Sequence, residues 1–216
     1  MIPRGTICLL VLAVAHSAVA NDHNWVLTRD RDGIQVYTRV VENSKFKAVK
    51  AVMTITASLG ELVALVRDAA ACTDWAALCA KAELVEILSE TEGYVYTLND
   101  LPWPISDRDV VAHVLWSQSP TDLAVTMSAT VVSGKLPIEE GVVRLSYGVV
   151  SWQFIPVGMG KIEIVSHAHL DPGGVTPAWL TNRLLVDSPF DTMVGMREMT
   201  NADRYKNSSF EFLSEP

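Results

Sequence analysis

The sequence predicts an α+β fold, in which an antiparallel sheet carries its helices on one side. Two observations carry most of this prediction. Residues 82–170 hold a series of short apolar segments with turn residues between them, which is typical of consecutive antiparallel strands. Apolar residues at helical spacing follow residue 58 and appear again after residue 176, on either side of that series.

The first three strands are expected between residues 24 and 56. Asp32-Gly33 is a strong turn signal within "NWVLTRDRDGIQVYTRVV", and Ile34, Val36 and Thr38 alternate with polar neighbours. The segment 45–56, "KFKAVKAVMTIT", continues as a strand. The chain therefore opens with a hairpin and a third strand.

A helix is expected to follow at once. Ser58 stands at the N-cap position and Glu61 three residues later, which completes a capping box. The segment 59–71, "LGELVALVRDAAA", then places apolar residues at helical intervals.

The rest of the chain is expected to form about six strands and a long terminal helix. The strand segments lie within residues 82–88, 92–98, 108–118, 122–132, 140–158 and 161–170. Thr176 is an N-cap candidate with Pro177 at the first helical position. Pro189 is expected to kink this helix rather than end it.

Residues 1–20 have the features of a signal peptide. Arg4 precedes the apolar run "ICLLVLAVA", and Ala18-Val19-Ala20 fits a small-x-small cleavage pattern. The apolar run is short for a membrane span. We therefore expect an exported protein, periplasmic or secreted, with a single domain over residues 21–216.

The charge balance argues against nucleic acid as a partner. The chain has 17 basic and 25 acidic residues, a net charge of −8, and removal of Arg4 would make it more negative. Nucleic-acid binding depends on clustered lysine and arginine, as does a lasting grip on anionic membranes. Only transient membrane contact is expected.

No established catalytic or cofactor motif occurs in the sequence, and no cofactor is expected. His167 and His169 share one face of a strand with Lys161 and Glu163, and their spacing indicates no third metal ligand. The interpretation favoured here is that both histidines face solvent, with Ile162, Ile164, Ala168 and Leu170 on the other face. No metal site is predicted.

Three segments in order resemble the START (steroidogenic acute regulatory protein-related lipid transfer) domain family. They are "GIQVYTR", the P-x-x-D-R-D pattern at 104–109, and the D-P-G-G-x-x-P-x-W-x-x-N pattern at 171–182. The resemblance extends from about Trp25 to Arg197. Trp75, Arg144 and Trp152 also stand where family members commonly have an arginine or an aromatic residue.

The resemblance implies a helix-grip fold, with a curved antiparallel sheet around a long C-terminal helix and a hydrophobic tunnel between them. The implied function is non-enzymatic binding, with transfer, of one lipid-like molecule. The "LPWPISDRD" loop, 101–109, would lie near the tunnel mouth. The candidate ligand-binding residues are Trp103, Arg108, Arg144, Asn182, Met193 and Met196.

Two features of the loop carry separate expectations. Prolines on both sides keep Trp103 out of the sheet, so it is expected to be partly exposed for membrane or ligand contact, with an internal plug as the alternative. Arg108 stands between Asp107 and Asp109 and is expected to form a charge-assisted fork that attaches the loop to the sheet. Some sterol-carrying relatives place a charged pair in the tunnel, and neither "VVAHVLW" nor "YVYTL" supplies one.

Two alternative functions stay open. An enzyme of the same broad fold, a cyclase or hydrolase of a hydrophobic substrate, would need an acid or base in the tunnel. His113 is the candidate because it alternates with Val111 and Leu115. The second alternative is a scaffold or binding protein with a collapsed tunnel.

Cys72 and Cys79 are expected to form a disulfide, because the leader directs the chain to an oxidising compartment. On one continuous helix their axial separation would be about 10.5 Å, which is beyond disulfide reach. The helix that begins near Ser58 is therefore expected to end before Asp74-Trp75.

Residues 187–200 are expected to act as a movable lid over the tunnel. Pro189 and Gly195 weaken helical hydrogen bonding, while Met193, Met196 and Met199 offer an adaptable apolar surface. The alternative is that these methionines fill the core.

Overall fold

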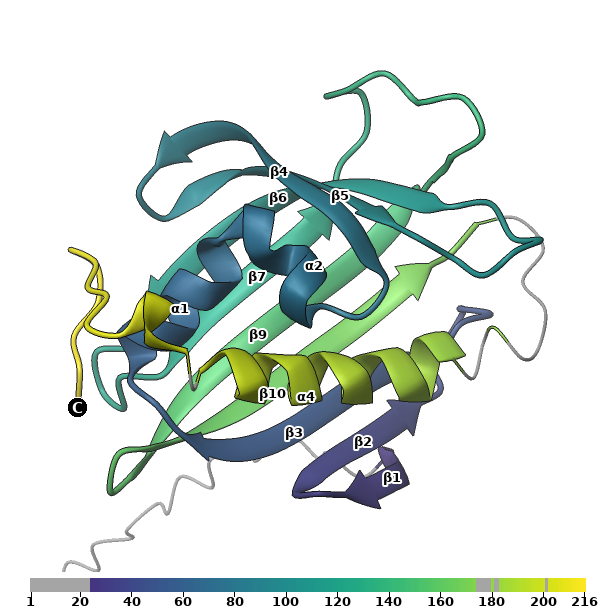
Figure 1. Cartoon of the computed structure of the whole chain (residues 1–216). Coiled ribbons are helices and arrows are strands. Elements are labelled where there is room, and N and C mark those ends of the chain that lie inside the picture. Colours follow the sequence, from purple (N-terminus) through teal and green to yellow (C-terminus); the bar gives the residue numbers. More distant parts are fainter. Residues whose placement is uncertain (1–23, 174–179, 181–182, 201) are drawn as a thin grey trace, which may run out of the picture.

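The computed structural model describes residues 24–173, 180, 183–200 and 202–216. Within that part of the chain, ten strands form one sheet and the helices lie on one face of it (Figure 1). The expected leader and the residues Thr176, Pro177 and Asn182 lie outside the described residues. The α+β fold class is confirmed.

The elements follow the chain in the expected order. The strands are β1 (Val26–Arg31), β2 (Ile34–Arg39), β3 (Ala48–Thr56), β4 (Cys79–Ser89), β5 (Glu92–Asn99), β6 (Arg108–Gln118), β7 (Val125–Val131), β8 (Val143–Arg144), β9 (Tyr147–Gly158) and β10 (Lys161–Asp171). The helical segments are α1 (Leu59–Arg67), a 3₁₀ turn (Ala69–Ala71), α2 (Cys72–Trp75), a π-helical turn (Arg183–Asp187), α4 (Ser188–Met199) and a second 3₁₀ turn (Asp203–Tyr205).

The strand order is β1-β2-β3-β10-β9-β7-β6-β5-β4, with β8 paired to β6. Every pair along this order is antiparallel, whereas the short β8 runs parallel to β6. The segment with α1 and α2 carries the chain from β3, inside the sheet, to β4 at its far edge. The last strand, β10, then returns to pair with β3, so the sheet is not a simple meander.

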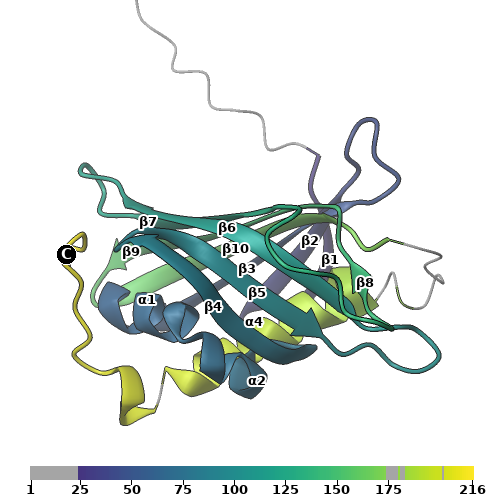
Figure 2. The same ribbon diagram turned by 90° about the horizontal axis from the view of Figure 1, so that it is seen from above.

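The sheet curves, and α1, α2 and α4 lie together on one face of it, as Figure 2 shows from above. Helix α4 packs against β2, β3 and α2. An ion pair of 2.7 Å between Arg29 and Asp187 ties the start of this helix to β1. At its other end, Arg197 donates to the Asp32 carbonyl at 2.7 Å. No helix in the described ranges is long and apolar enough to cross a membrane.

The local signals of the N-terminal half are confirmed. Ser58 and Glu61 form both bonds of the capping box at the start of α1. Asp32 and Gly33 both adopt positive φ in the β1–β2 turn, which suits the twist of a tight hairpin.

Several element boundaries differ from the sequence prediction, among them the starts of β4 and β7, at Cys79 and Val125. β3 begins at Ala48, which leaves residues 45–47 in the preceding loop. α1 ends at Arg67, because the chain tightens into a 3₁₀ turn on its way to the disulfide. The expected strand 140–158 is two strands, β8 and β9. The first part pairs with β6, whereas the second lies between β7 and β10 and pairs with both.

Candidate functional site

Two adjoining cavities, of about 590 and 480 Å³, are the candidate binding site. The larger is lined by β9, β10, the loop before β3 and the start of α4, and the smaller by β4–β7, β9 and the α1–α2 segment. Both volumes fall in the range of small-molecule sites, about 300–1,000 Å³. Residues that line both cavities are Asn99, Leu145, Val150, Trp152, Leu170 and Thr192.

Strand alternation explains why the cavity walls are mostly apolar. On β6, the residues that line the smaller cavity are Val110, Ala112, Val114 and Trp116. On β10, Ala168 and Leu170 line the larger cavity, as the sequence pattern predicted for that face. Since successive side chains of a strand point to opposite faces, these residues all lie on the helical side of the sheet.

The disulfide between Cys72 and Cys79 is present, with Cα atoms 5.9 Å apart. The chain turns back at Leu78, whose φ is 67°, so the expected end of the helix before this point is confirmed. The turn places Trp75 in the cavity wall, where its ring meets that of Trp152 edge-on with centroids 6.0 Å apart. Such a bridge is typical of oxidising compartments.

The Asp-Arg-Asp triplet sends its three side chains to three different places. Asp107 accepts a hydrogen bond of 3.1 Å from the Leu101 backbone N–H and so closes the loop. Arg108 lines the larger cavity, beside its cross-strand neighbour Asn99. Asp109 lies on the opposite face of β6.

The expected fork between Arg108 and its flanking aspartates is wrong. The guanidinium donates to backbone carbonyls instead, to Pro172 at 3.1 Å, to Gly173 at 3.4 Å and to Ser106. The bonds to Pro172 and Gly173 connect the start of β6 to the end of β10, so Arg108 does attach the loop to the sheet, through neutral acceptors. Burial lowers the pKa of Arg108, and the charge of nearby Asp107 partly opposes this shift.

The fork is formed by Asp109 and Arg144 on the outer face of β6. Nε and Nη2 of Arg144 donate to the two carboxylate oxygens at 2.7 and 2.8 Å. Two further bonds go to the carbonyls of Leu136 and Pro137, and the hydrogen bonds to Asp109 raise the pKa of Arg144. Arg144 is not among the residues that line either cavity, so its role in ligand contact stays a prediction.

Trp103 is 91% exposed at the tip of its loop. The alternative of an internal plug is therefore wrong for this conformation. The loop adjoins the larger cavity, because Leu101 at its base is part of the cavity lining. Contact of Trp103 with membrane or ligand stays a prediction.

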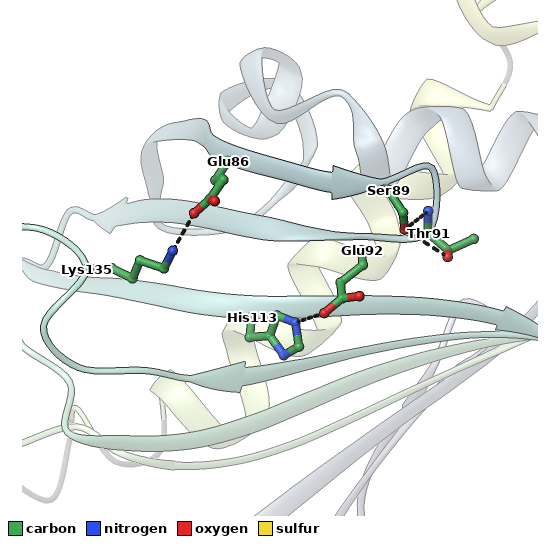
Figure 3. A network of polar contacts seen from close by, with 6 residues as sticks. All are labelled: Glu86, Ser89, Thr91, Glu92, His113 and Lys135. Carbon is green, nitrogen blue, oxygen red and sulfur yellow. Dashed lines mark hydrogen bonds and ion pairs between the residues drawn. The ribbon is translucent and has the colours of Figure 1, made fainter.

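His113 faces away from the cavities. Its Nε2 lies 2.7 Å from Glu92 Oε1, and its ring is 5.0 Å from that of Tyr94 (Figure 3). The expected alternation with Val111 and Leu115 is correct, but this set of β6 residues lies on the outer face. The enzyme alternative needs His113 to point into the cavity, and that prediction is wrong.

The side chains of His167 and His169 lie on the face of β10 opposite Ala168 and Leu170. His169 Nε2 lies 3.0 Å from Ser44 Oγ, and its ring meets that of Tyr147 edge-on. His167 borders the larger cavity, but its ring centroid lies 5.7 Å from that of Trp25, on the face of β10 opposite Ala168, as the alternation predicted. Among the described residues, no three metal-ligating side chains gather at one point.

The second half of the terminal helix is packed more tightly than the sequence indicated. Met193 and Met196 are completely buried in the core, and neither lines a cavity. Gly195 faces the backbone of Trp75, and a Cβ atom there would stand 2.4 Å from the Trp75 carbonyl oxygen. Gly195 thus permits close packing of α4 on α2, and the view that it loosens the helix is wrong. Ligand contact by the two methionines and opening of the helix stay predictions.

Sequence reasoning missed Lys45 and Lys47, which line the larger cavity from the loop before β3. Their segment was assigned to a strand, where the two lysines would share a face. The turn-rich stretch Asn43-Ser44 immediately before them was the available signal, since it indicates a loop that continues beyond residue 44.

The fold and the cavities together define the class of this protein: a helix-grip protein with a ligand-sized apolar cavity between sheet and helices. A family model described as the START domain matches residues 11–204. The chain therefore belongs to the START domain family. This family has a lipid-binding fold, which agrees with the mostly apolar walls of the two cavities.

Individual relatives agree with this assignment. The chain is 34% identical over 197 residues to an uncharacterized protein of Pseudomonas aeruginosa, covering 90% of this chain and 96% of the relative. The crystal structure of a STAR-related lipid transfer protein from Xanthomonas axonopodis has a TM-score of 0.76 and 32% identity, covering 83% of this chain and 99% of that chain. The human StAR-related lipid transfer protein 5 shares the fold, with a TM-score of 0.76 at 19% identity over 84% and 88% of the two chains.

Proposed function

We propose that this protein holds a single lipid-like molecule in its adjoining cavities and transfers it between membranes without chemical change. The observation that carries the proposal is the pair of ligand-sized cavities, which share six lining residues and have mainly apolar walls. Each methylene group moved from water into such a site gains about 0.8 kcal/mol. Burial of an acyl chain alone would therefore drive capture.

Features around the larger cavity support transfer rather than storage alone. The exposed Trp103 stands on the loop whose base forms part of the cavity wall. Tryptophan favours the boundary between lipid and water, so the loop would rest on a membrane during exchange. The disulfide and the leader-like segment 1–20 support action outside the cytoplasm, in a periplasmic or secreted setting.

Transfer of a labelled lipid between two vesicle populations tests this function. Val150 lines both cavities, so Val150→Trp fills the site. Its neighbour Val149 is 40% exposed on the opposite face of β9, and Val149→Trp is the matched control. We expect Val150→Trp to abolish transfer and Val149→Trp to preserve it.

Native mass spectrometry of the purified protein gives a second measurement. We expect an added mass corresponding to one lipid on the original chain and on Val149→Trp, and none on Val150→Trp. Transfer by the filled variant at the original rate, with its fold intact, would show that the cavities do not carry the lipid.

A further inference from the structure

The polar groups of the two cavities are not distributed evenly. The charged residues that line the larger cavity are Lys45, Lys47 and Arg108, with no acidic residue among them. Those that line the smaller cavity are Arg67, Asp68, Glu90 and Glu92, of which Glu92 directs its carboxylate to His113 on the outer face. In a chain with a net charge of −8, one end of the site is thus basic.

Arg108 is the centre of this basic end. Arg108 is only 6% exposed, and the three acceptors of its hydrogen bonds are neutral carbonyl oxygens. Among the described residues Arg108 forms no ion pair, the charge of Asp107 acts on it only through space, and residues 174–182 contain no acid in the sequence. The neighbouring Asp107 is engaged with the Leu101 N–H.

A buried charge of this kind is costly unless it is paired. A guanidinium has five N–H groups, and Arg108 uses three of them on carbonyls. Two N–H donors, one on each terminal nitrogen, have no partner among the described residues. They are suited to an anionic oxygen, for which arginine has a fork geometry.

The two lysines extend the same charge to the rim. Lys45 and Lys47 are exposed on both sides of Phe46, and neither makes an ion pair or side-chain hydrogen bond within the described part of the chain. Nothing in the fold therefore requires their charges. Asn99 and Thr192 line the same space and can supply neutral hydrogen bonds.

We infer that the ligand carried in the cavity has an anionic end, a carboxylate or phosphate group, which Arg108 binds while Lys45 and Lys47 attract it at the rim. The apolar part of the ligand extends past Val150 and Trp152 into the smaller cavity. This inference rests on the proposed function, since it names the class of lipid that the site selects.

Binding of two ligands with the same apolar chain tests the inference. Hexadecanoate and hexadecanol are titrated into delipidated full-length protein, and their dissociation constants are compared. We expect hexadecanoate to bind at least about tenfold more tightly, the factor that one charge-assisted hydrogen bond supplies. Tail-labelled phosphatidylglycerol and phosphatidylcholine, each as a trace in phosphatidylcholine vesicles, repeat the comparison with membrane lipids.

Three variants locate the effect. Arg108→Gln should remove most of the preference, and the double variant Lys45→Gln/Lys47→Gln should reduce it, more clearly at low salt because these side chains are exposed. Lys161→Gln is the matched control, since Lys161 is an exposed lysine at the opposite end of β10. If Arg108→Gln does not fold, the lysine variant decides, because those lysines make no contacts that hold the fold.

The outcomes separate the two proposals. Equal affinity for hexadecanoate and hexadecanol would overturn the anionic preference and leave lipid binding intact. Failure of both to bind would overturn the proposed function itself. Inorganic phosphate alone is also titrated as a competitor: displacement of hexadecanol by millimolar phosphate would indicate a site for the free anion and contradict selection of a lipid.

Discussion

The close packing of α4 on α2 decides whether alanine at position 195 would stabilise or destabilise the protein. Gly195 lies within α4, where helix propensity alone says that alanine would stabilise the protein. A Cβ atom at this position would stand 2.4 Å from the Trp75 oxygen, 2.8 Å from its Cα and 3.0 Å from its carbonyl carbon. These are backbone atoms, held by the nearby disulfide, so no side chain can rotate out of the way.

The two contributions can be compared. Replacing glycine by alanine in a helix interior gains about 1 kcal/mol. An extra methyl group in a well-packed interface costs about 1–3 kcal/mol, and a clash with three backbone atoms belongs at the upper end. We therefore expect Gly195→Ala to lower the free energy of unfolding by about 1–2 kcal/mol. In a domain of this size each kcal/mol lowers the Tm by about 2–4 °C.

Urea unfolding followed by tryptophan fluorescence measures this effect. The midpoint should fall while the m-value stays the same, since the surface exposed on unfolding does not change. Glu198→Ala, at an exposed position of the same helix, serves as the control and should change stability by less than about 0.5 kcal/mol. A Gly195→Ala variant that is stabilised by about 1 kcal/mol would refute the close contact between α4 and Trp75.

Three further predictions concern the outer face, the C-terminal turn and the loop. Asp109→Asn should cost about 3–5 kcal/mol in urea unfolding because it leaves the buried Arg144 charge without its partner, and a cost below 1 kcal/mol would argue against the ion pair. Burial and a hydrogen bond to Asp68 raise the pKa of Tyr205 to about 12, above its ordinary value of 10.0; this stabilisation is complete below pH 10 and is lost as the pH rises towards 12. Tyr205→Phe should lack that part of the alkaline loss in a pH series of melting temperatures, and an unchanged profile would exclude this tyrosine as its source. Trp103→Ala should slow extraction of lipid from vesicles and leave the Tm unchanged, whereas a large fall in Tm would place the indole in a structural role.

The sequence by itself determined the fold class, the order of the elements and the disulfide. The capping box at Ser58 and Glu61 and the turn at Asp32-Gly33 are local, so their geometry follows from neighbours along the chain. Period-two alternation likewise assigned Ala168 and Leu170 to the cavity face of β10. The cysteine spacing, with the helix length it permits, predicted where α1 had to end.

Alternation also divided the side chains of β6 into two sets, but it could not say which set lies inside. His113 was placed on the correct set of residues and on the wrong side of the sheet. The inner side is decided by where α1, α2 and α4 pack, and those contacts join segments far apart in the sequence. The same holds for Arg108 and Asp109, adjacent residues that the strand sends to opposite faces.

Only the tertiary structure decided which charges are paired. The partner of Asp109 is Arg144, 35 residues further along the chain, and it is brought there when β8 pairs with β6. Arg108 forms no ion pair among the described residues, because its acceptors are backbone carbonyls, two of which lie at the end of β10. Spacing along a sequence records neighbours in the chain, whereas ion pairs and cavities depend on distances across the sheet, which are set when the strands assemble.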